Sequence, residues 1–166
     1  MQYGPFLFSE MVFLWSVWEQ SHQNSGYFSY MGRIVCIDYG MKRCGIAATD
    51  PLQIIVSAVT TVSTPDLLSF FEEYLKQESV EKLVVGLPVH TDGTYTYLKQ
   101  QIDDFCTSFS KKWAHIPIAF ADEQFSSVQA RQIILQSGVK KEKRKDKALV
   151  DKVSAVLILQ RYLHHI

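Results

Sequence analysis

The sequence predicts an α/β protein with a mixed five-stranded sheet flanked by helices. Of its 166 residues, 47% are hydrophobic and 20% are charged, which is a globular composition that suits one ordinary domain. Three strand-like segments come first along the chain, and helical and strand-like segments then alternate. This order implies an antiparallel portion that continues into a parallel portion, with helices covering the sheet.

The predicted strands are short apolar runs rich in β-branched residues. We expect a turn between the first two strands, from Gly40 to Gly45, so that these strands form a hairpin. Pro51 and Pro65 bound the third strand, and Pro88 follows the fourth. The five predicted strands cover residues 34–37, 46–49, 54–62, 82–87 and 116–121.

Four helices are predicted from capping residues and apolar spacing. The first begins at Thr64, whose hydroxyl is expected to cap it, followed by Pro65 in the first turn. A capping box of Ser126 and Gln129 predicts another start. The predicted helices cover residues 64–77 and 95–112, then a segment that begins at 126, then a last segment that ends near His165.

Residues 1–30 differ in composition from the rest of the chain. They hold no Lys or Arg, and their acids are Glu10 and Glu19. The aromatic segment within them lacks the features of a secretory signal and is too short to span a membrane. We expect an N-terminal extension that is dispensable or poorly ordered, with Met31 as a candidate start, followed by the folded domain over residues 31–166. The alternative is an arm that docks on the domain or on a partner.

Net charge and cysteine spacing exclude several classes of protein. The formal net charge is zero, so a strongly basic coat for nucleic acid is absent and any basic surface must be local. Cys36, Cys44 and Cys106 are widely spaced and match no metal-finger pattern, so we expect reduced thiols, packed in or near the core, in a cytoplasmic protein.

Three carboxylates are expected to converge at one edge of the sheet. Asp38 ends the first predicted strand and Glu123 follows the fifth, and ligands bind at the carboxyl ends of parallel strands. Asp151 lies on an otherwise small, apolar stripe of the last helix, where an unpaired acid is costly. Such acids could hold Mg²⁺ or Mn²⁺ and catalyse phosphodiester hydrolysis. The structural alternative is that Asp38 caps a turn, Glu123 caps a helix and Asp151 pairs with a neighbouring lysine.

Two groups of cations could contact a nucleic-acid backbone. Lys42 and Arg43 follow Asp38, and the alternative for this pair is a solvated hairpin tip. The tract from Lys140 to Lys147 holds six cations and two acids, and it is either a solvated loop or a mobile arm over phosphates. The candidate substrate-binding residues are Lys42, Arg43, Lys143, Arg144 and Lys145.

From Met31 to its end, the chain resembles the YqgF/RuvX family, whose members are described as Holliday junction resolvases and as pre-16S rRNA nucleases. Four segments carry the resemblance. They are DYGMKRCGIA at 38–47, DPL at 50–52, VVGLP at 84–88 with DG at 92–93, and the closing helix at 147–160. The sequence differs from the family pattern at Gln124, where Arg is usual, and at residues 94–97, where Gly-Pro is usual.

The resemblance implies a ribonuclease H-like fold with Asp38, Glu123 and Asp151 as catalytic and metal-binding acids. It also implies hydrolysis of phosphodiester bonds with Mg²⁺ or Mn²⁺, in the cytoplasm, during 5′-end maturation of pre-16S rRNA. Expected partners are precursor rRNA or branched DNA and a ribosomal particle, with no membrane, and the chain acts as a monomer or a homodimer. The alternatives are a Holliday junction resolvase, a non-catalytic RNA-binding ribosome-assembly factor and, least favoured, an ATPase of the actin and sugar-kinase type.

Overall fold

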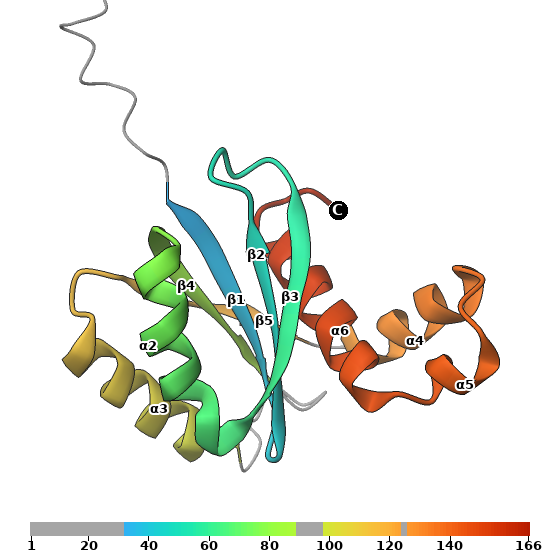
Figure 1. Cartoon of the computed structure of the whole chain (residues 1–166), viewed down its shortest axis with the longest axis horizontal. Coiled ribbons are helices and arrows are strands. Elements are labelled where there is room, and N and C mark those ends of the chain that lie inside the picture. The colour runs from blue at the N-terminus through green and yellow to red at the C-terminus, as the bar shows by residue number, and fades with distance from the viewer. Residues whose placement is uncertain (1–31, 89–97, 124–125) are drawn as a thin grey trace, which may run out of the picture. The chain divides into compact units, whose positions relative to one another are not determined.

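The protein folds around a five-stranded mixed sheet, as the sequence predicts (Figure 1). The computed structural model describes residues 32–88, 98–123 and 126–166. In the strand order β3-β2-β1-β4-β5, β2 is antiparallel to β1 and β3, whereas β4 is parallel to β1 and β5. The strands are β1 Arg33–Tyr39, β2 Arg43–Thr49, β3 Val56–Ser63, β4 Val80–Leu87 and β5 Ile118–Asp122.

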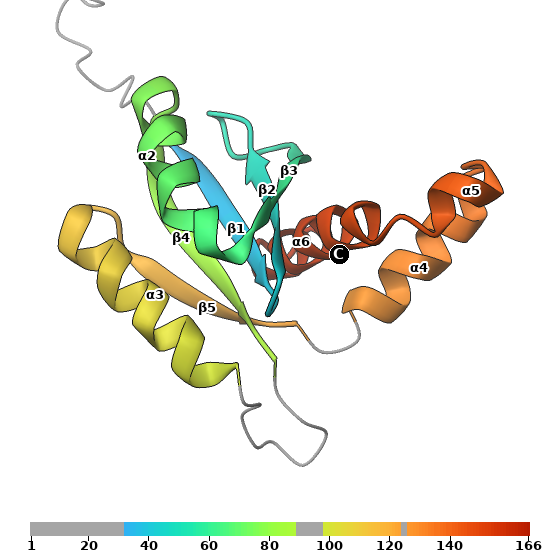
Figure 2. The same ribbon diagram turned by 60° about the horizontal axis from the view of Figure 1, so that its bottom comes forward.

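Helices cover both faces of the sheet. Helices α2 and α3 lie on one face, and α6 lies across the other with α4 packed beside it (Figures 1 and 2). The helical elements are the 3₁₀ turn η1 Thr64–Asp66 and the helices α2 Leu67–Gln77, α3 Lys99–Lys112, α4 Ser126–Gln136, α5 Lys141–Arg144 and α6 Lys147–Tyr162. None of the helices among the described residues is long and apolar enough to cross a membrane.

The face that α2 and α3 cover holds the larger core. Alternate residues of the central strands, such as Ile37 and Val85, point into it and are fully buried. Rings from both helices fill the layer, with Phe71 packed edge-on against Phe109 at 5.2 Å between centroids. This core anchors the inner strands, and therefore the strand that carries Asp38.

The face that α6 covers is built from small side chains. Cys36 of β1, Ala47 of β2 and Val84 of β4 pack against Ala155 and Ile158 of α6. Because strand residues alternate between faces, Asp38, Gly45 and Gly86 belong to the same face as Cys36, Ala47 and Val84. Small residues let a helix approach a sheet closely, so the sequence stripe predicted on α6 is confirmed as its packing face.

Several local predictions were wrong. Strand β2 begins at Arg43, so Gly45 is a strand residue and the turn is confined to Gly40–Lys42. The Thr64 hydroxyl does not cap a helix but donates to the carbonyl oxygen of Gly40 at 2.7 Å, which ties η1 to the hairpin. The charged tract is not a loop throughout, because residues 141–144 form α5 and Asp146 caps α6 by accepting from the Ala148 amide at 2.9 Å.

Other sequence predictions are confirmed in whole or in part, or lie beyond the described residues. Cys36 and Cys44 are buried, Cys106 is half-buried, and all three are free thiols. Helix α4 begins at Ser126 as predicted, but the predicted capping box does not form: the Gln129 side chain accepts a hydrogen bond from Arg161 of α6, and the Ser126 amide donates to the carbonyl oxygen of Glu123. The extension, the start of the predicted helix at residues 95–97, Asp92, Gly93 and Gln124 all lie outside the described residues.

Candidate active site

Asp38 lies near the carboxyl end of β1, the central strand. Its side chain is partly buried on the face that α6 covers, in line with Ile34 and Cys36. Across the antiparallel ladder, its partner on β2 is Gly45. On the other side, the parallel ladder pairs Ile37 with Val85, so Gly86 is the next residue of β4 beside Asp38. Asp38 therefore stands between two strands that carry glycine at its level.

Gly45 brings Asp151 to this position. A side-chain Cβ atom at Gly45 would lie 2.0 Å from the carbonyl oxygen of Asp151, which no protein atom tolerates. The backbone of α6 thus rests directly on β2 opposite Asp38. The negative charge of Asp151 is close enough to contribute to a raised pKa at Asp38. The structure therefore brings together the two acids that the sequence places on β1 and on the last helix.

Gly86 provides the corresponding space for Glu123. Glu123 comes directly after β5, and its carbonyl oxygen accepts from the amide of Ser126 at 2.9 Å, at the start of α4. A Cβ atom at Gly86 would lie 2.8 Å from Glu123 Oε2 and 3.1 Å from Ile158 Cδ1. Glu123 Oε2 is buried and has no hydrogen-bond partner among the described residues. The third acid therefore points over β4 toward Asp38.

The proximity of the carboxyl groups raises their pKa values. Burial raises the pKa of Asp38 to about 6, and the charge of Asp151 adds to this, whereas Glu123 and Ser154 lower it. Burial and then the charge of Asp38 raise the pKa of Glu123 to about 9. Because the two groups interact, they titrate as a pair. At neutral pH the metal-free pair holds a proton, mainly on Glu123.

Arg43 neutralises Asp151. Its Nε atom lies 2.9 Å from Asp151 Oδ2, with the two side chains 40% and 25% exposed. This pair replaces the predicted alternative in which Asp151 pairs with Lys147 or Lys152. Arg43 is the first residue of β2, and the ion pair holds its guanidinium beside Asp151 of α6.

The donor set fits a hard divalent cation in its chemistry. Asp38, Glu123 and Asp151 offer carboxylate oxygens, which Mg²⁺ and Mn²⁺ prefer, and Glu123 Oε2 has no other partner in the described part of the chain. As these side chains stand, no three His, Cys, Asp or Glu residues within the described ranges form a group that could hold a metal ion. Two acids face each other, and the third is held by Arg43.

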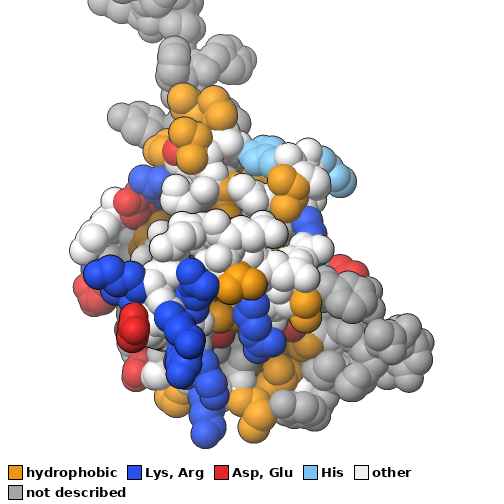
Figure 3. Space-filling view, turned by 90° about the vertical axis from the view of Figure 1, so that its right-hand side faces the viewer, with side chains coloured by type: hydrophobic (Ala, Val, Ile, Leu, Met, Phe, Trp, Pro, Cys, Tyr) orange, Lys and Arg blue, Asp and Glu red, His pale blue; other side chains and the backbone are white. Residues whose placement is uncertain are grey.

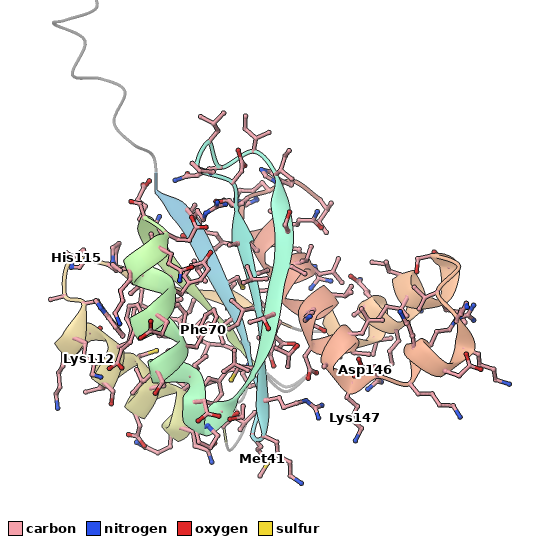
Figure 4. All side chains as sticks on the ribbon, viewed as in Figure 1. Met41, Phe70, Lys112, His115, Asp146 and Lys147 are labelled. Atoms are coloured by element: carbon pink, nitrogen blue, oxygen red, sulfur yellow. The ribbon has the colours of Figure 1, made fainter. Side chains whose placement is uncertain are left out.

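The remaining candidate cations lie in two places. Lys42 is exposed at the hairpin tip next to Met41, which Figure 4 places at the edge of the molecule where β1 ends. On α5, Lys143 is exposed, as is Lys145 just after it, whereas the Arg144 guanidinium folds back to the carbonyl oxygen of Val139. Helix α5 packs against α4 and α6, not against the sheet (Figure 1).

Sequence reasoning missed Gly45, Gly86 and Ser154 as parts of this site. The sequence predicts a turn from Gly40 to Gly45, and it gives Gly86 only as part of the VVGLP segment. Their signal was available in the alternation of strand residues, since 36, 38, 45, 47, 84 and 86 share one face. Ser154 lies three residues after Asp151 on α6, on the same face of the helix.

The strand order, with a central strand that carries an acid and two further acids beside it, defines a ribonuclease H-like domain. Among solved structures, the fold is similar to that of the fowlpox virus resolvase in complex with Holliday junction DNA. The TM-score is 0.54 at 11% sequence identity, over 80% of this chain and 97% of that chain. At this identity the likeness concerns the fold.

Sequence comparisons identify the family of the chain. Residues 32–165 match a family described as "RuvX: Holliday junction resolvase". A protein of Christiangramia forsetii named "Putative pre-16S rRNA nuclease" is 46% identical over 81% of this chain and 99% of its own length. Proteins of the same name from Porphyromonas gingivalis and Bacteroides fragilis are 48% and 47% identical over 80% of this chain and 96% of their own lengths. The chain belongs to the RuvX family.

The carboxyl pair predicts an unusual pH dependence of stability. The folded, metal-free protein keeps the Glu123 proton to about pH 9, whereas the unfolded chain loses it near the ordinary value of 4.5. Between these values the folded state binds more protons, so the free energy of unfolding should fall as pH rises. Glu123→Gln removes the titrating group and should flatten this decline.

Urea denaturation with a chelator present, at several pH values from about 5 to 9, measures the effect. Glu142→Gln, which changes an exposed acid on α5, is the control and should keep the wild-type slope. An equal slope in Glu123→Gln would mean that Glu123 is ionised in the folded protein and does not share a proton with Asp38.

Proposed function

We propose that this protein is a metal-dependent nuclease that hydrolyses phosphodiester bonds during 5′-end maturation of pre-16S rRNA. One observation carries the proposal: glycines on both strands beside Asp38 admit Asp151 and Glu123 to the same face. The substrate follows from the relatives that are named as pre-16S rRNA nucleases and that match this domain over nearly their full length. The proposed location is the cytoplasm.

In this proposal Asp38, Glu123 and Asp151 hold Mg²⁺ or Mn²⁺. Such ions activate a water molecule and stabilise the leaving oxygen of a phosphodiester. The protein's own contribution is to keep three carboxyl groups together and to exclude water from Glu123 Oε2. Arg43 balances the charge of Asp151 in the metal-free protein, and it is free to contact a substrate phosphate once Asp151 turns toward the cation.

The basic residues suggest where the nucleic acid runs. Lys42 and Arg43 lie at the hairpin beside the acids, and Lys143 and Lys145 extend the positive surface over α5. Figure 3 shows Lys and Arg side chains gathered on the side of the molecule where α4 and α5 lie. In Figure 4, Lys147 at the start of α6 lies toward the same edge as Met41. A backbone that crosses from the hairpin toward α5 would pass the acids.

Two alternatives have specific support. The family description and the fold of the fowlpox protein favour a resolvase of branched DNA, which would need two active sites and hence a homodimer. The Arg43–Asp151 pair, which occupies one of the three acids, favours a non-catalytic RNA-binding factor that acts on a ribosomal particle. Cleavage of labelled precursor rRNA and of a four-way DNA junction, each with Mg²⁺ or Mn²⁺, distinguishes the three functions.

Asp38→Asn should lower the turnover of precursor rRNA by orders of magnitude, because it removes the carboxylate at the centre of the site. The backbone of β1 makes the ladder contacts with β2 and β4, and the substitution leaves the backbone unchanged, so the variant should still fold. Asp104→Asn, an exposed acid of α3 on the opposite face of the sheet, is the matched control and should cleave at the wild-type rate. If Asp38→Asn cleaves as fast as the control, the site is assigned wrongly.

Replacing Lys143 and Lys145 together with Ala should weaken RNA binding and reduce its salt dependence. Each lysine that contacts a phosphate of a single strand contributes about 0.7 to the slope of log affinity against log salt. The control replaces Lys76 and Lys111, exposed lysines of α2 and α3, and should leave that slope unchanged. Equal slopes for both double variants would make the residues around α5 an ordinary solvated surface.

A further inference from the structure

Ser154 of α6 is a buried serine whose hydroxyl is unused by the fold. The residue is 0% exposed, and its Oγ atom has no hydrogen-bond partner among the described residues. A serine inside a helix usually donates to the carbonyl oxygen four residues earlier, as Ser108 does to Asp104 at 2.9 Å. A buried hydroxyl without a partner opposes folding, so it calls for a role in a site or a partner that is absent.

Ser154 lies in the same part of the structure as Asp38, Glu123 and Asp151. It lies three residues after Asp151 and four before Ile158, so the three side chains share one face of α6. Ile158 Cδ1 and Glu123 Oε2 both lie over Gly86. The Asp151 carbonyl of α6 rests on Gly45 and Ile158 lies over Gly86, and these glycines stand on either side of Asp38. Ser154 lies between these two contacts on the same helix face, so it belongs to the part of α6 that covers Asp38.

The two buried polar atoms that lack hydrogen bonds both lie near Asp38. Within the described ranges, Glu123 Oε2 and Ser154 Oγ are the buried side-chain oxygen or nitrogen atoms without a hydrogen bond, and both belong to residues that lie over the strands beside Asp38. They come from different elements, α6 and the residue after β5, so local helix geometry does not explain both.

We propose that Ser154 is a positioning residue of the metal site, which donates a hydrogen bond to the Asp38 carboxylate when a divalent cation is bound. This inference rests on the proposed metal-dependent function. A hydroxyl has one hydrogen to donate, so it can hold one carboxylate oxygen and leave the other for the cation. Residues that orient metal ligands in this way raise affinity without touching the metal.

The test is the Mn²⁺ affinity of the full chain, measured by calorimetry without nucleic acid, for wild type and Ser154→Ala. We expect the dissociation constant to rise about tenfold or more in the variant, within the range for lost ligand-orienting partners. The melting temperature of the metal-free protein should stay unchanged or rise, since an unpaired hydroxyl is removed and alanine favours helix. Ser108→Ala, at an ordinary helix serine, should keep wild-type affinity.

The results distinguish a failure of the proposed role of Ser154 from a failure of the proposed nuclease function. Equal Mn²⁺ affinity in Ser154→Ala and wild type overturns the role of Ser154, and so does the absence of Mn²⁺ binding by wild type. A fall in the metal-free melting temperature with unchanged affinity makes Ser154 a packing residue only. If wild type binds Mn²⁺ but cleaves neither RNA nor branched DNA, the nuclease function fails, while the difference in affinity still decides the role of Ser154.

Discussion

The contact of α6 with β2 at Gly45 is the constraint on which the site depends. Gly45 is the ladder partner of Asp38, and the carbonyl oxygen of Asp151 occupies the space that any side chain there would need. The distance between the strand acid and the helix acid is therefore set by backbone packing, which is much stiffer than a pair of flexible side chains. A larger residue at this position would push α6 outward and separate the two carboxylates.

Gly86 repeats this arrangement on the other side of Asp38, with the Glu123 carboxyl group in place of a side chain. Both arrangements concentrate negative charge in a partly buried place, which costs free energy in the absence of a cation. The metal-free protein relieves this cost in two ways. A proton remains on the Asp38–Glu123 pair, and Arg43 forms an ion pair with Asp151. A divalent cation would compete with the proton for the Asp38–Glu123 pair and with Arg43 for Asp151.

The sequence was sufficient for a mixed sheet with an antiparallel and a parallel portion, and for the positions of Asp38 and Glu123 at the ends of parallel strands; it did not give the spatial order, in which β4 lies between β1 and β5. Hydrophobic runs report burial, and parallel strands end at the same edge, so both inferences rest on local signals. The same signals misplace the start of β2, because glycine is common in turns and Gly45 is nevertheless a strand residue. Its role becomes clear only when the helix that packs against it is known.

Long-range contacts of polar side chains were beyond the sequence for the same reason. Arg43 and Asp151 are 108 residues apart, and nothing local distinguishes this pair from Asp151 with Lys147 or Lys152. The unused hydroxyl of Ser154 is likewise invisible, since most helix serines bond to their own backbone. The sequence shows that Asp151 and Ser154 share one helix face, but only the structure shows that this face lies over Asp38.

We propose that the three acids form one site in which a divalent cation replaces a proton. Calorimetric titration of the wild-type protein with Mn²⁺ at neutral pH, repeated in two buffers of different ionisation enthalpy, measures the protons released on binding. Because Glu123 holds its proton at this pH, we expect the release of about one proton for each binding event. Binding without proton release would show that Asp38 and Glu123 are not ligands of the cation, and the absence of Mn²⁺ binding would show that the three acids do not form a metal site.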